Sequence, residues 1–391
     1  MSNNILTSAK AAKKDEFYTQ FNDIQNEINS YLDYDPNVFC NKSILLPCDD
    51  PEESNFTRFF AQNFDTLGLK RLISTSYSPE SKKNIYGFQP DLFAEKDKQN
   101  QQKKNITNGK IFSLFSDLTG DGKINIDDLK WEFLRGDGDF RSKEVDDICK
   151  EVDIIITNPP FSLFREFFQW LIMKRKKFII IGNINALTYR EVFSSILKNE
   201  VWLGHGFKGG NASFAFPTQL KEEFEQLPQY DSTSGMIKFG NVCWLTNMEH
   251  GRRHQKLSLM TMKENLKFNK SIKNKNAYQK YLNYDAIEVP RVDAIPSDYE
   301  GIMGVPISFL EKHCPEQFEI LGMCENKNLY GLRTKKFSPK ERKEAYFKKH
   351  GTYLDKKGKE GSYDLNASGV LNIDGQLKVT YDRLLIKKVG L

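Results

Sequence analysis

Four consecutive residues near the middle of the chain, Asn158, Pro159, Pro160 and Phe161, are suited to one kind of chemistry. The exocyclic amine of adenine or cytosine is a poor nucleophile, because its lone pair is delocalised into the ring. The Asn158 side-chain oxygen and the Pro159 carbonyl can accept both N–H hydrogens and push that density back. Pro160 fixes φ and keeps Pro159 extended, while Phe161 offers a ring on which an extruded base can stack. The tetrapeptide therefore predicts methylation of an exocyclic amine, and this chemistry requires neither a metal nor a general base.

The tetrapeptide follows a run of three isoleucines at residues 154–156, which is typical of a strand buried on both faces. In open α/β sheets, ligands bind at the carboxyl ends of such strands. The alternative is that Asn-Pro-Pro only starts a loop, as it does in many proteins. We favour the functional interpretation, because a buried strand precedes the motif and an aromatic residue ends it.

The composition is that of a globular chain. Hydrophobic residues make up 39% and charged residues 28%, which excludes a disordered protein, and 391 residues give room for two domains. No apolar run approaches membrane-spanning length, and the first residues lack the apolar core of a signal peptide, so we expect a cytoplasmic protein without membrane contact. The six cysteines show no zinc-ligand spacing. The net charge of +5 permits nucleic-acid binding without arguing strongly for it.

Strands and helices alternate through the first two thirds of the chain, which predicts an α/β fold. Apolar residues at helical spacing indicate a helix at residues 16–34, and Ser54 and Ser142 are N-cap candidates for later helices. A further helix is expected at residues 162–175. Short apolar segments predict strands at residues 43–46, 70–77, 110–115, 177–182, 201–204 and 241–246. The polar residues 78–109 are predicted to be a surface insertion.

Two acids, Asp49 and Asp50, lie between the strand at residues 43–46 and the helix that begins near Ser54. This is the first strand–turn–helix of a nucleotide-type fold, but it lacks the glycine-rich phosphate cradle. The predicted methylation needs a methyl donor, and the donor S-adenosylmethionine has no phosphate that would require such a cradle. It carries a cationic sulfonium and an amino group, which either carboxylate could face. The alternative is that both acids are solvated and are stabilised by the helix dipole.

Residues 136–142 contain a flexible turn that is followed by Asp139 and Phe140. A carboxylate that accepts from an exocyclic amine, next to a ring that packs on its face, suits an adenine pocket. A plain surface turn would have the same composition. Its place one helix before the tetrapeptide favours the pocket.

Residues 117–128 match the pattern of a twelve-residue calcium loop, with glycine at position six and a carboxylate at position twelve. Threonine stands at position three, and the last position is aspartate in place of glutamate. The candidate ligands are Asp117, Thr119, Asp121, Lys123 and Asp128. The alternative is a hydrogen-bonded turn before a helix that starts near Asp127.

The last third of the chain is irregular and rich in lysine from residue 251 onwards. Residues 333–359 are cationic and carry aromatic residues, which suits a nucleic-acid surface, and a solvated helix face is an equal alternative. The alternation at residues 370–388, around Asp374 and Gly375, predicts a hairpin. Residues 204–217, rich in glycine and phenylalanine, suit either a flap over a flipped base or an aromatic core.

Six segments carry a family resemblance in a fixed order: KDEFYT, LLPCDDP, GDGDFRS, DIIITNPPFSLFREF, KKFIIIGNINALTY and YDAIEVPRVDAIPSDYEGIMGVPISFL. Together they resemble the EcoRI-type adenine-specific methyltransferases over most of the chain. The resemblance implies a class I, Rossmann-like methyltransferase sheet with helices on both faces over residues 1–250. It also implies an α+β region for DNA target recognition over residues 251–391. The insertion and the calcium-like loop depart from the family pattern.

The resemblance further implies transfer of a methyl group from S-adenosylmethionine to N6 of a flipped-out adenine in double-stranded DNA. A cognate restriction endonuclease that acts separately is a candidate partner. No acid ends the strand at residues 70–77, where this family usually binds the ribose, so that contact is unassigned. The cofactor-binding residues that the resemblance implies are Phe17, Tyr18, Thr19, Cys48, Asp49, Asp50, Asp139, Phe140 and Asn158.

Two other classes of function remain open. A methyltransferase that acts on RNA adenine or on a protein glutamine would share the tetrapeptide and the sheet, although the basic carboxyl-terminal region favours nucleic acid over protein. A non-catalytic DNA-binding or calcium-responsive module is the second alternative, and the intact tetrapeptide argues against it.

Overall fold

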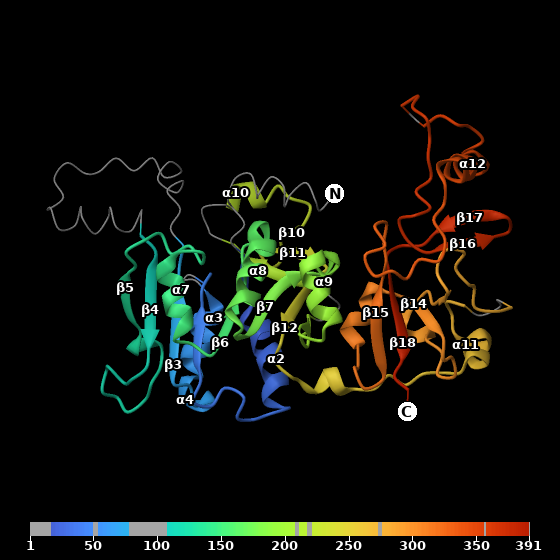
Figure 1. Cartoon of the computed structure of the whole chain (residues 1–391). Helices are drawn as coiled ribbons and strands as arrows, with labels where there is room; N and C mark the ends of the chain where they lie inside the picture. Colours follow the sequence, from blue (N-terminus) through green and yellow to red (C-terminus); the bar gives the residue numbers. More distant parts are fainter. Residues whose placement is uncertain are drawn as a thin grey trace. The chain divides into compact units, whose positions relative to one another are not determined.

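The computed structural model describes residues 17–49, 54–77, 108–207, 211–216, 221–272, 276–355 and 357–390. The chain divides into two units, Met1–Gly251 and Arg252–Leu391, which are shown in Figure 1 and described separately below. The predicted insertion lies mostly outside the described residues, as does Asp50. No helix among the described residues is long and apolar enough to cross a membrane.

The first unit contains an eight-stranded sheet in the order β5-β4-β3-β2-β6-β7-β12-β8. Its strands are β2 (Ser43–Leu46), β3 (Arg71–Thr75), β4 (Lys110–Leu114), β5 (Lys130–Phe133), β6 (Ile154–Thr157), β7 (Lys177–Asn183), β8 (Trp202–Leu203) and β12 (Val242–Thr246). The four central strands β3, β2, β6 and β7 are parallel, and β12 runs antiparallel between β7 and β8. The chain passes from β2 to β3 on one side and from β6 to β7 on the other, so the strand order reverses between β2 and β6. Open α/β sheets bind ligands at such a reversal.

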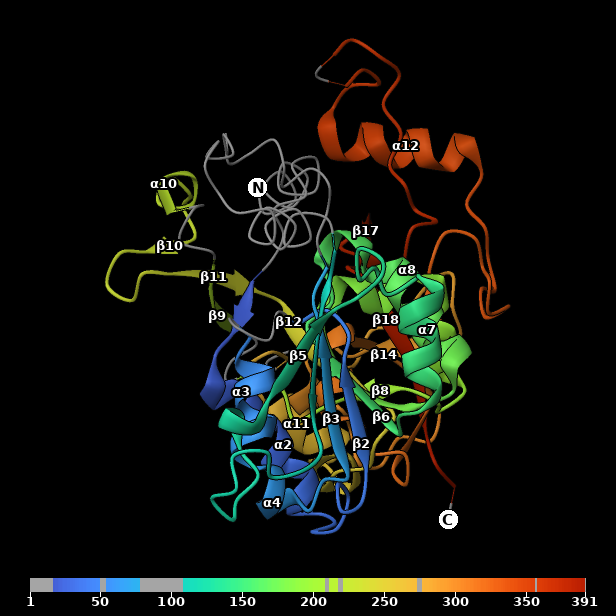
Figure 2. The same ribbon diagram turned by 90° about the vertical axis from the view of Figure 1, so that its left-hand side faces the viewer.

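Helices cover both faces of this sheet, because its central strands are apolar on both faces. Figure 2 shows α2, α3 and α4 on one side of the strands and α7 and α8 on the other. Ser54 and Ser142 cap α3 and α7 through their hydroxyls, as the sequence predicts. The helices of this unit are α2 (Phe21–Leu32), α3 (Asn55–Gln62), α4 (Phe64–Leu67), α7 (Lys143–Lys150), α8 (Phe164–Lys174), α9 (Arg190–Leu197) and the short α10 (Lys221–Phe224).

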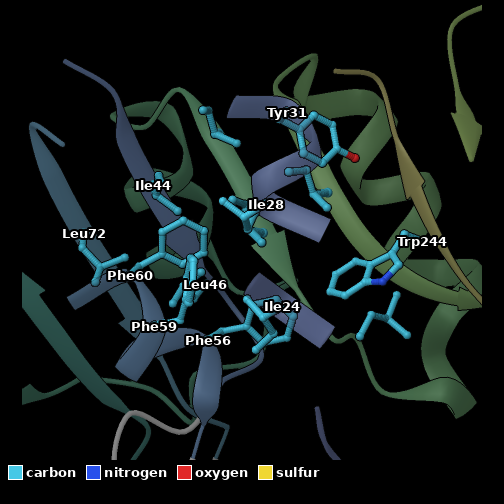
Figure 3. Packing of buried hydrophobic residues seen from close by; sticks show 14 of the residues in the cluster. Ile24, Ile28, Tyr31, Ile44, Leu46, Phe56, Phe59, Phe60, Leu72 and Trp244 are labelled. Atoms are coloured by element: carbon cyan, nitrogen blue, oxygen red, sulfur yellow. The ribbon is translucent and has the colours of Figure 1, made fainter. Parts of the chain in front are cut away.

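One large hydrophobic core lies between the sheet and α2 and α3. Figure 3 shows Ile24 and Ile28 of α2 together with Phe56 of α3 and Ile44 of β2. All four are at most 1% exposed. Leu45, between Ile44 and Leu46, belongs to the opposite face, as the two-residue repeat of a strand requires.

A small second sheet, in the order β1-β9-β11-β10, lies in the same unit. Its strands are β1 (Tyr18–Thr19), β9 (Asn211–Ala215), β10 (Tyr230–Asp231) and β11 (Met236–Gly240). Within the glycine- and phenylalanine-rich segment, Phe214 is fully buried, and Phe207 stacks on Trp244 at 5.4 Å between ring centroids. The aromatic-core interpretation of this segment therefore describes Phe207 and Phe214.

The region between β3 and α7 differs from the expectation in one respect. No helix starts near Asp127: a single 3-10 turn, Ile126–Asp128, leads directly into β5. β5 pairs antiparallel with β4, which itself is antiparallel to β3. The sequence did not indicate β5, because the strand is only four residues long: Trp131 and Phe133 alternate with Lys130 and Glu132, but two repeats are too few to predict a strand.

The second unit is more regular than the sequence indicated. It contains a four-stranded sheet, β13-β14-β18-β15, and a separate hairpin, β16-β17. The strands are β13 (Ala286–Glu288), β14 (Ile302–Pro306), β15 (Phe318–Cys324), β16 (Val370–Ile373), β17 (Gln376–Val379) and β18 (Arg383–Lys388), and the helices are α11 (Met262–Phe268) and α12 (Pro339–His350). The predicted turn at Asp374 and Gly375 joins β16 to β17, but residues 383–388 leave that hairpin and pair with β14 and β15.

Candidate active site

Asn158 comes directly after β6, at the carboxyl edge of the parallel strands. Its Nδ2 donates a hydrogen bond of 2.7 Å to the main-chain carbonyl of Phe17. Its Oδ1 is buried and has no hydrogen-bond partner among the described residues. A buried carbonyl oxygen without a donor is costly, so the side chain presents an acceptor that a ligand can satisfy.

The two prolines and Phe161 fix the backbone beyond Asn158. Pro160 has φ −55° and ψ 123°, and its carbonyl accepts from the Leu163 N–H at 2.9 Å as the chain turns into α8. The Phe161 ring is half-buried, with ring centroids 5.9 Å from Phe17 and 6.1 Å from Phe214. The aromatic cluster therefore holds one part of this ring, and the remainder is exposed.

β1, in the other sheet, carries two of the predicted cofactor residues, Tyr18 and Thr19, and the third, Phe17, directly precedes it. Thr19 pairs with Phe214 in β9, and its main-chain carbonyl accepts from the Asn55 side chain at 2.8 Å. The Thr19 hydroxyl is buried without a hydrogen-bond partner in the described part of the chain. Thr19 Oγ1 and Asn158 Oδ1 are thus both buried and unsatisfied. The hydrogen bond from Asn158 to Phe17 joins the two segments that carry these atoms.

Asp49 is buried at the carboxyl end of β2, where it joins three segments. Its carboxylate accepts from the Ser54 hydroxyl at 2.7 Å and from the Thr157 hydroxyl at 2.6 Å, and its main-chain carbonyl accepts from the Ser74 hydroxyl at 2.7 Å. The carboxylate thus connects the end of β2 to the start of α3 and the end of β6. The contacts of these hydroxyls were not predicted from the sequence, although Ser74 and Thr157 are polar residues near the ends of apolar strands. The predicted contact of Asp49 with a cationic ligand stays a prediction.

The turn at residues 136–139 packs against the end of β3. Gly138 has φ +80°, and a Cβ there would lie 2.1 Å from the Ser76 carbonyl oxygen, so only glycine fits. The predicted adenine-pocket turn therefore lies at the same sheet edge as Asp49 and Asn158. Cys48, the remaining predicted cofactor residue with a described position, is half-buried beside Asp49.

Within this turn, Asp139 forms a short ion pair with Arg141, which also pairs with Glu166 of α8. Although burial opposes it, hydrogen bonding to Arg141 lowers the pKa of Asp139 below its ordinary value. The Phe140 ring is only 4% exposed and packs on Phe167, 5.0 Å between centroids. Phe140 is therefore part of the core under α8, and its predicted contact with a ligand stays a prediction.

The calcium-like loop is held by its own backbone. Asp117 accepts from the N–H groups of Gly120 and Gly122, and Asp128 accepts from those of Leu118, Thr119 and Asn125. Asp121 accepts from the Lys123 N–H. Among the described residues, no group of three or more His, Cys, Asp and Glu side chains is placed to hold a metal ion. The loop forms a hydrogen-bonded turn, and its predicted binding of calcium stays a prediction.

The sequence matches a family described as "Adenine-specific methyltransferase EcoRI" over residues 5–389. The chain belongs to this family. The type II methyltransferase M.EcoRI of Escherichia coli is 42% identical over 321 residues, which cover 82% of this chain and 89% of that protein. M.MgeORF184P of Mycoplasma genitalium is 30% identical over 384 residues, 97% of each chain, and M.MpnI of Mycoplasma pneumoniae is 32% identical over 322 residues, 81% and 85%. No solved structure matches.

Membership of the EcoRI adenine-specific methyltransferase family confirms the resemblance that the ordered motifs indicate. It also identifies the chain as a methyltransferase with a mixed α/β fold. Three contacts place segments of these motifs at one edge of the large sheet: Asn158 with Phe17, Asp49 with Thr157, and Gly138 with Ser76. The individual roles of these residues belong to the proposal that follows.

Proposed function

We propose that the protein is a site-specific DNA methyltransferase that transfers a methyl group from S-adenosylmethionine to N6 of an adenine flipped out of duplex DNA. The observation that carries this proposal is the side chain of Asn158. Its nitrogen is occupied by the Phe17 carbonyl, and its oxygen is buried and unsatisfied. An oxygen held in this way can accept one N6 hydrogen without reorganising when the base arrives.

The remaining residues of the motif would complete the base pocket. The Pro159 carbonyl would accept the second N6 hydrogen, and the exposed part of the Phe161 ring would stack on the base. With both hydrogens accepted, the amine recovers nucleophilic character. Extruding the base costs a few kcal/mol, and contacts of basic side chains with DNA phosphates would offset this cost.

The sheet supports a class I methyltransferase fold for the first unit. The four central strands are parallel, and the strand order reverses between β2 and β6. The antiparallel strand β12 lies next to the parallel strand β7. The antiparallel β4–β5 pair occupies the edge beyond β3. We assign the second unit, Arg252–Leu391, to recognition of the DNA target.

The residues at the carboxyl edge fit S-adenosylmethionine, which supplies an electrophilic methyl group on a sulfonium. Thr19 offers a buried hydroxyl that lacks a partner among the described residues, and Asp49 and Asp139 offer carboxylates. In this assignment β1 holds the methionine part, Asp49 provides negative charge beside the cationic groups, and Asp139 accepts from the adenine amine. The ribose-binding residue is unassigned.

The test is transfer of labelled methyl from S-adenosylmethionine to unmethylated duplex DNA, to RNA and to protein, followed by nucleoside analysis and sequencing. We expect N6-methyladenine in one fixed sequence context, and label only in RNA or in protein glutamine would contradict the proposal. Asn158→Ala should reduce transfer at least about a hundredfold, since the loss of one such stabilising contact commonly costs that much. Cofactor binding by this variant should be retained.

A separate restriction endonuclease would recognise the same site, in keeping with the type II names of the relatives. DNA that the enzyme has methylated should then resist an endonuclease of the same specificity. Cleavage of fully methylated DNA by that endonuclease would contradict this part of the proposal.

A further inference from the structure

One part of the second unit is built around its own small core. Phe337, Ala345, Leu365 and Val370 pack together and join α12 to the β16-β17 hairpin. We call residues 335–379 the basic module. Both views place α12 at the end of the unit opposite α11 (Figures 1 and 2). Residues 333–359 carry eleven Lys and Arg against three Asp and Glu, whereas the net charge of the whole chain is only +5.

α12 is almost entirely exposed. Of its twelve residues only Ala345 is buried. Some cations of the module are neutralised locally, in the pairs Lys335–Glu341, Arg342–Asp364 and Lys343–Glu360. Lys340 and Lys348 are exposed, and no carboxylate of the described residues lies within ion-pair distance of either. These two lysines are therefore positive charge on α12 that no described carboxylate neutralises.

Two aromatic rings stand exposed beside this charge. Phe347 and Tyr353 stack at 4.5 Å between centroids with 17° between their planes, and they are 41% and 51% exposed. Leu354 next to them is 54% exposed. A helix face that only meets water has no use for a cluster of apolar side chains, so these residues indicate a surface that is covered by a partner.

We propose that the basic module binds the sugar–phosphate backbone of duplex DNA beside the methylation site, with Lys340 and Lys348 on phosphates and the Phe347–Tyr353 stack against deoxyribose. This inference rests on the proposed function. DNA is the partner that matches dense positive charge, because its phosphates form a dense line of negative charge along the duplex. Lysine provides a flexible point charge suited to a phosphate, so the module adds affinity without reading the sequence.

The test compares two full-length variants that lose the same charge. Lys340→Gln/Lys348→Gln removes two exposed lysines of α12 that have no ion-pair partner among the described residues. Lys42→Gln/Lys70→Gln is the control and removes two exposed lysines just before β2 and β3. They lie at the amino ends of these strands, whereas the candidate active site lies at the carboxyl ends. Glutamine keeps helix propensity close to that of lysine, so α12 should remain folded. Binding to a duplex with the mapped methylation site and to one without it is measured from 50 to 300 mM salt.

For the Lys340/Lys348 variant we expect the plot of log affinity against log salt to become less steep by about two, one unit for each lost phosphate contact. Affinity at low salt should fall about tenfold for both duplexes, and the ratio between them should not change. The rate of methylation at saturating DNA should also be unchanged.

Three outcomes would overturn the inference while leaving the proposed function intact. The salt dependence of the module variant could equal that of the wild type, or the control variant could lose as much affinity as the module variant. A change in the ratio between the two duplexes would also contradict it, since that would mean base readout. Failure of the wild type to bind or methylate any duplex DNA would instead refute the proposed function, and the inference with it.

Discussion

The Asn158 side chain has a donor that is bonded and an acceptor that is not: Nδ2 donates to the Phe17 carbonyl, and Oδ1 has no hydrogen-bond partner among the described residues. Because the atom that faces the Phe17 carbonyl must be a donor, the amide can adopt only one orientation, with its oxygen toward the unsatisfied side. The partner is a main-chain carbonyl 141 residues away in the sequence. The geometry of the acceptor thus depends on where the chain places β1.

At the scale of the residue, Asn158→Asp should be nearly inactive although it is isosteric. A carboxylate has no N–H for the Phe17 carbonyl and repels it, so the acceptor loses its fixed position. We expect kcat to fall about a hundredfold or more, measured by single-turnover methyl transfer. Cofactor affinity, measured by equilibrium dialysis, should change less than about threefold.

Asn55→Asp is the matched control for this variant. Asn55 also donates its side-chain N–H to a carbonyl of β1, that of Thr19, but it belongs to α3 and is outside the base pocket. If the loss of activity in Asn158→Asp came only from loosening β1, Asn55→Asp would lose as much. Equal losses in the two variants would therefore argue against a direct role of Asn158.

At the scale of the element, a buried ion pair joins two strands of the second unit. Arg383 of β18 donates to both carboxylate oxygens of Glu288 in β13, which also accepts from the Tyr281 hydroxyl. Glu288 is 9% exposed and Arg383 is 8% exposed. Because β13 and β18 are both neighbours of β14, this pair connects strands that do not hydrogen-bond to each other.

Arg383→Met should destabilise the second unit strongly, since it leaves the Glu288 carboxylate buried without its cation. We expect a loss of about 3–5 kcal/mol in the free energy of unfolding, measured by urea denaturation. Amide hydrogen exchange should locate the loss in β13, β14, β15 and β18.

Arg291→Met removes a comparable arginine whose pair with Asp293 is exposed, 69% and 55% for the two side chains. Its cost should stay below about 0.5 kcal/mol. Similar costs for Arg291→Met and Arg383→Met would show that burial of the Glu288 pair is not what matters.

At the scale of the whole molecule, carboxylates in both units favour the folded state only while they are ionised. The ion pair with Lys238 lowers the pKa of Asp231 in the first unit to about 2, and hydrogen bonds from Lys335 and the Ser338 N–H lower the pKa of Glu341 in the second to about 2. Unfolded carboxyls titrate near pH 4. The stabilisation is therefore complete above about pH 4 and is lost as the pH falls toward 2.

The melting temperature should accordingly be level from pH 7 to about 5 and fall between about pH 4 and 2.5. A variant with both Asp231→Asn and Glu341→Gln should melt lower than the wild type at pH 6, and this difference should shrink as the pH falls. Scanning calorimetry over the pH series measures both. A difference that grows at low pH would have the wrong sign for this account.

The sequence alone determined the features that depend on neighbouring residues. Apolar runs placed β2, β3, β6, β7 and β12, side-chain hydroxyls identified the caps of α3 and α7, and the tetrapeptide at residues 158–161 identified the candidate catalytic segment. These are local properties of burial period, capping chemistry and fixed φ, so they can be read along the chain.

Only the tertiary structure decided which distant segments meet. It paired β4 antiparallel with β3 and β5 antiparallel with β4, moved β18 from the expected hairpin into a sheet with β14 and β15, and engaged Asp49 with the hydroxyl of Thr157. It also brought Phe17 to Asn158. Strand partners and hydrogen bonds between residues more than a hundred positions apart depend on how the whole core packs. A local sequence pattern does not predict this packing.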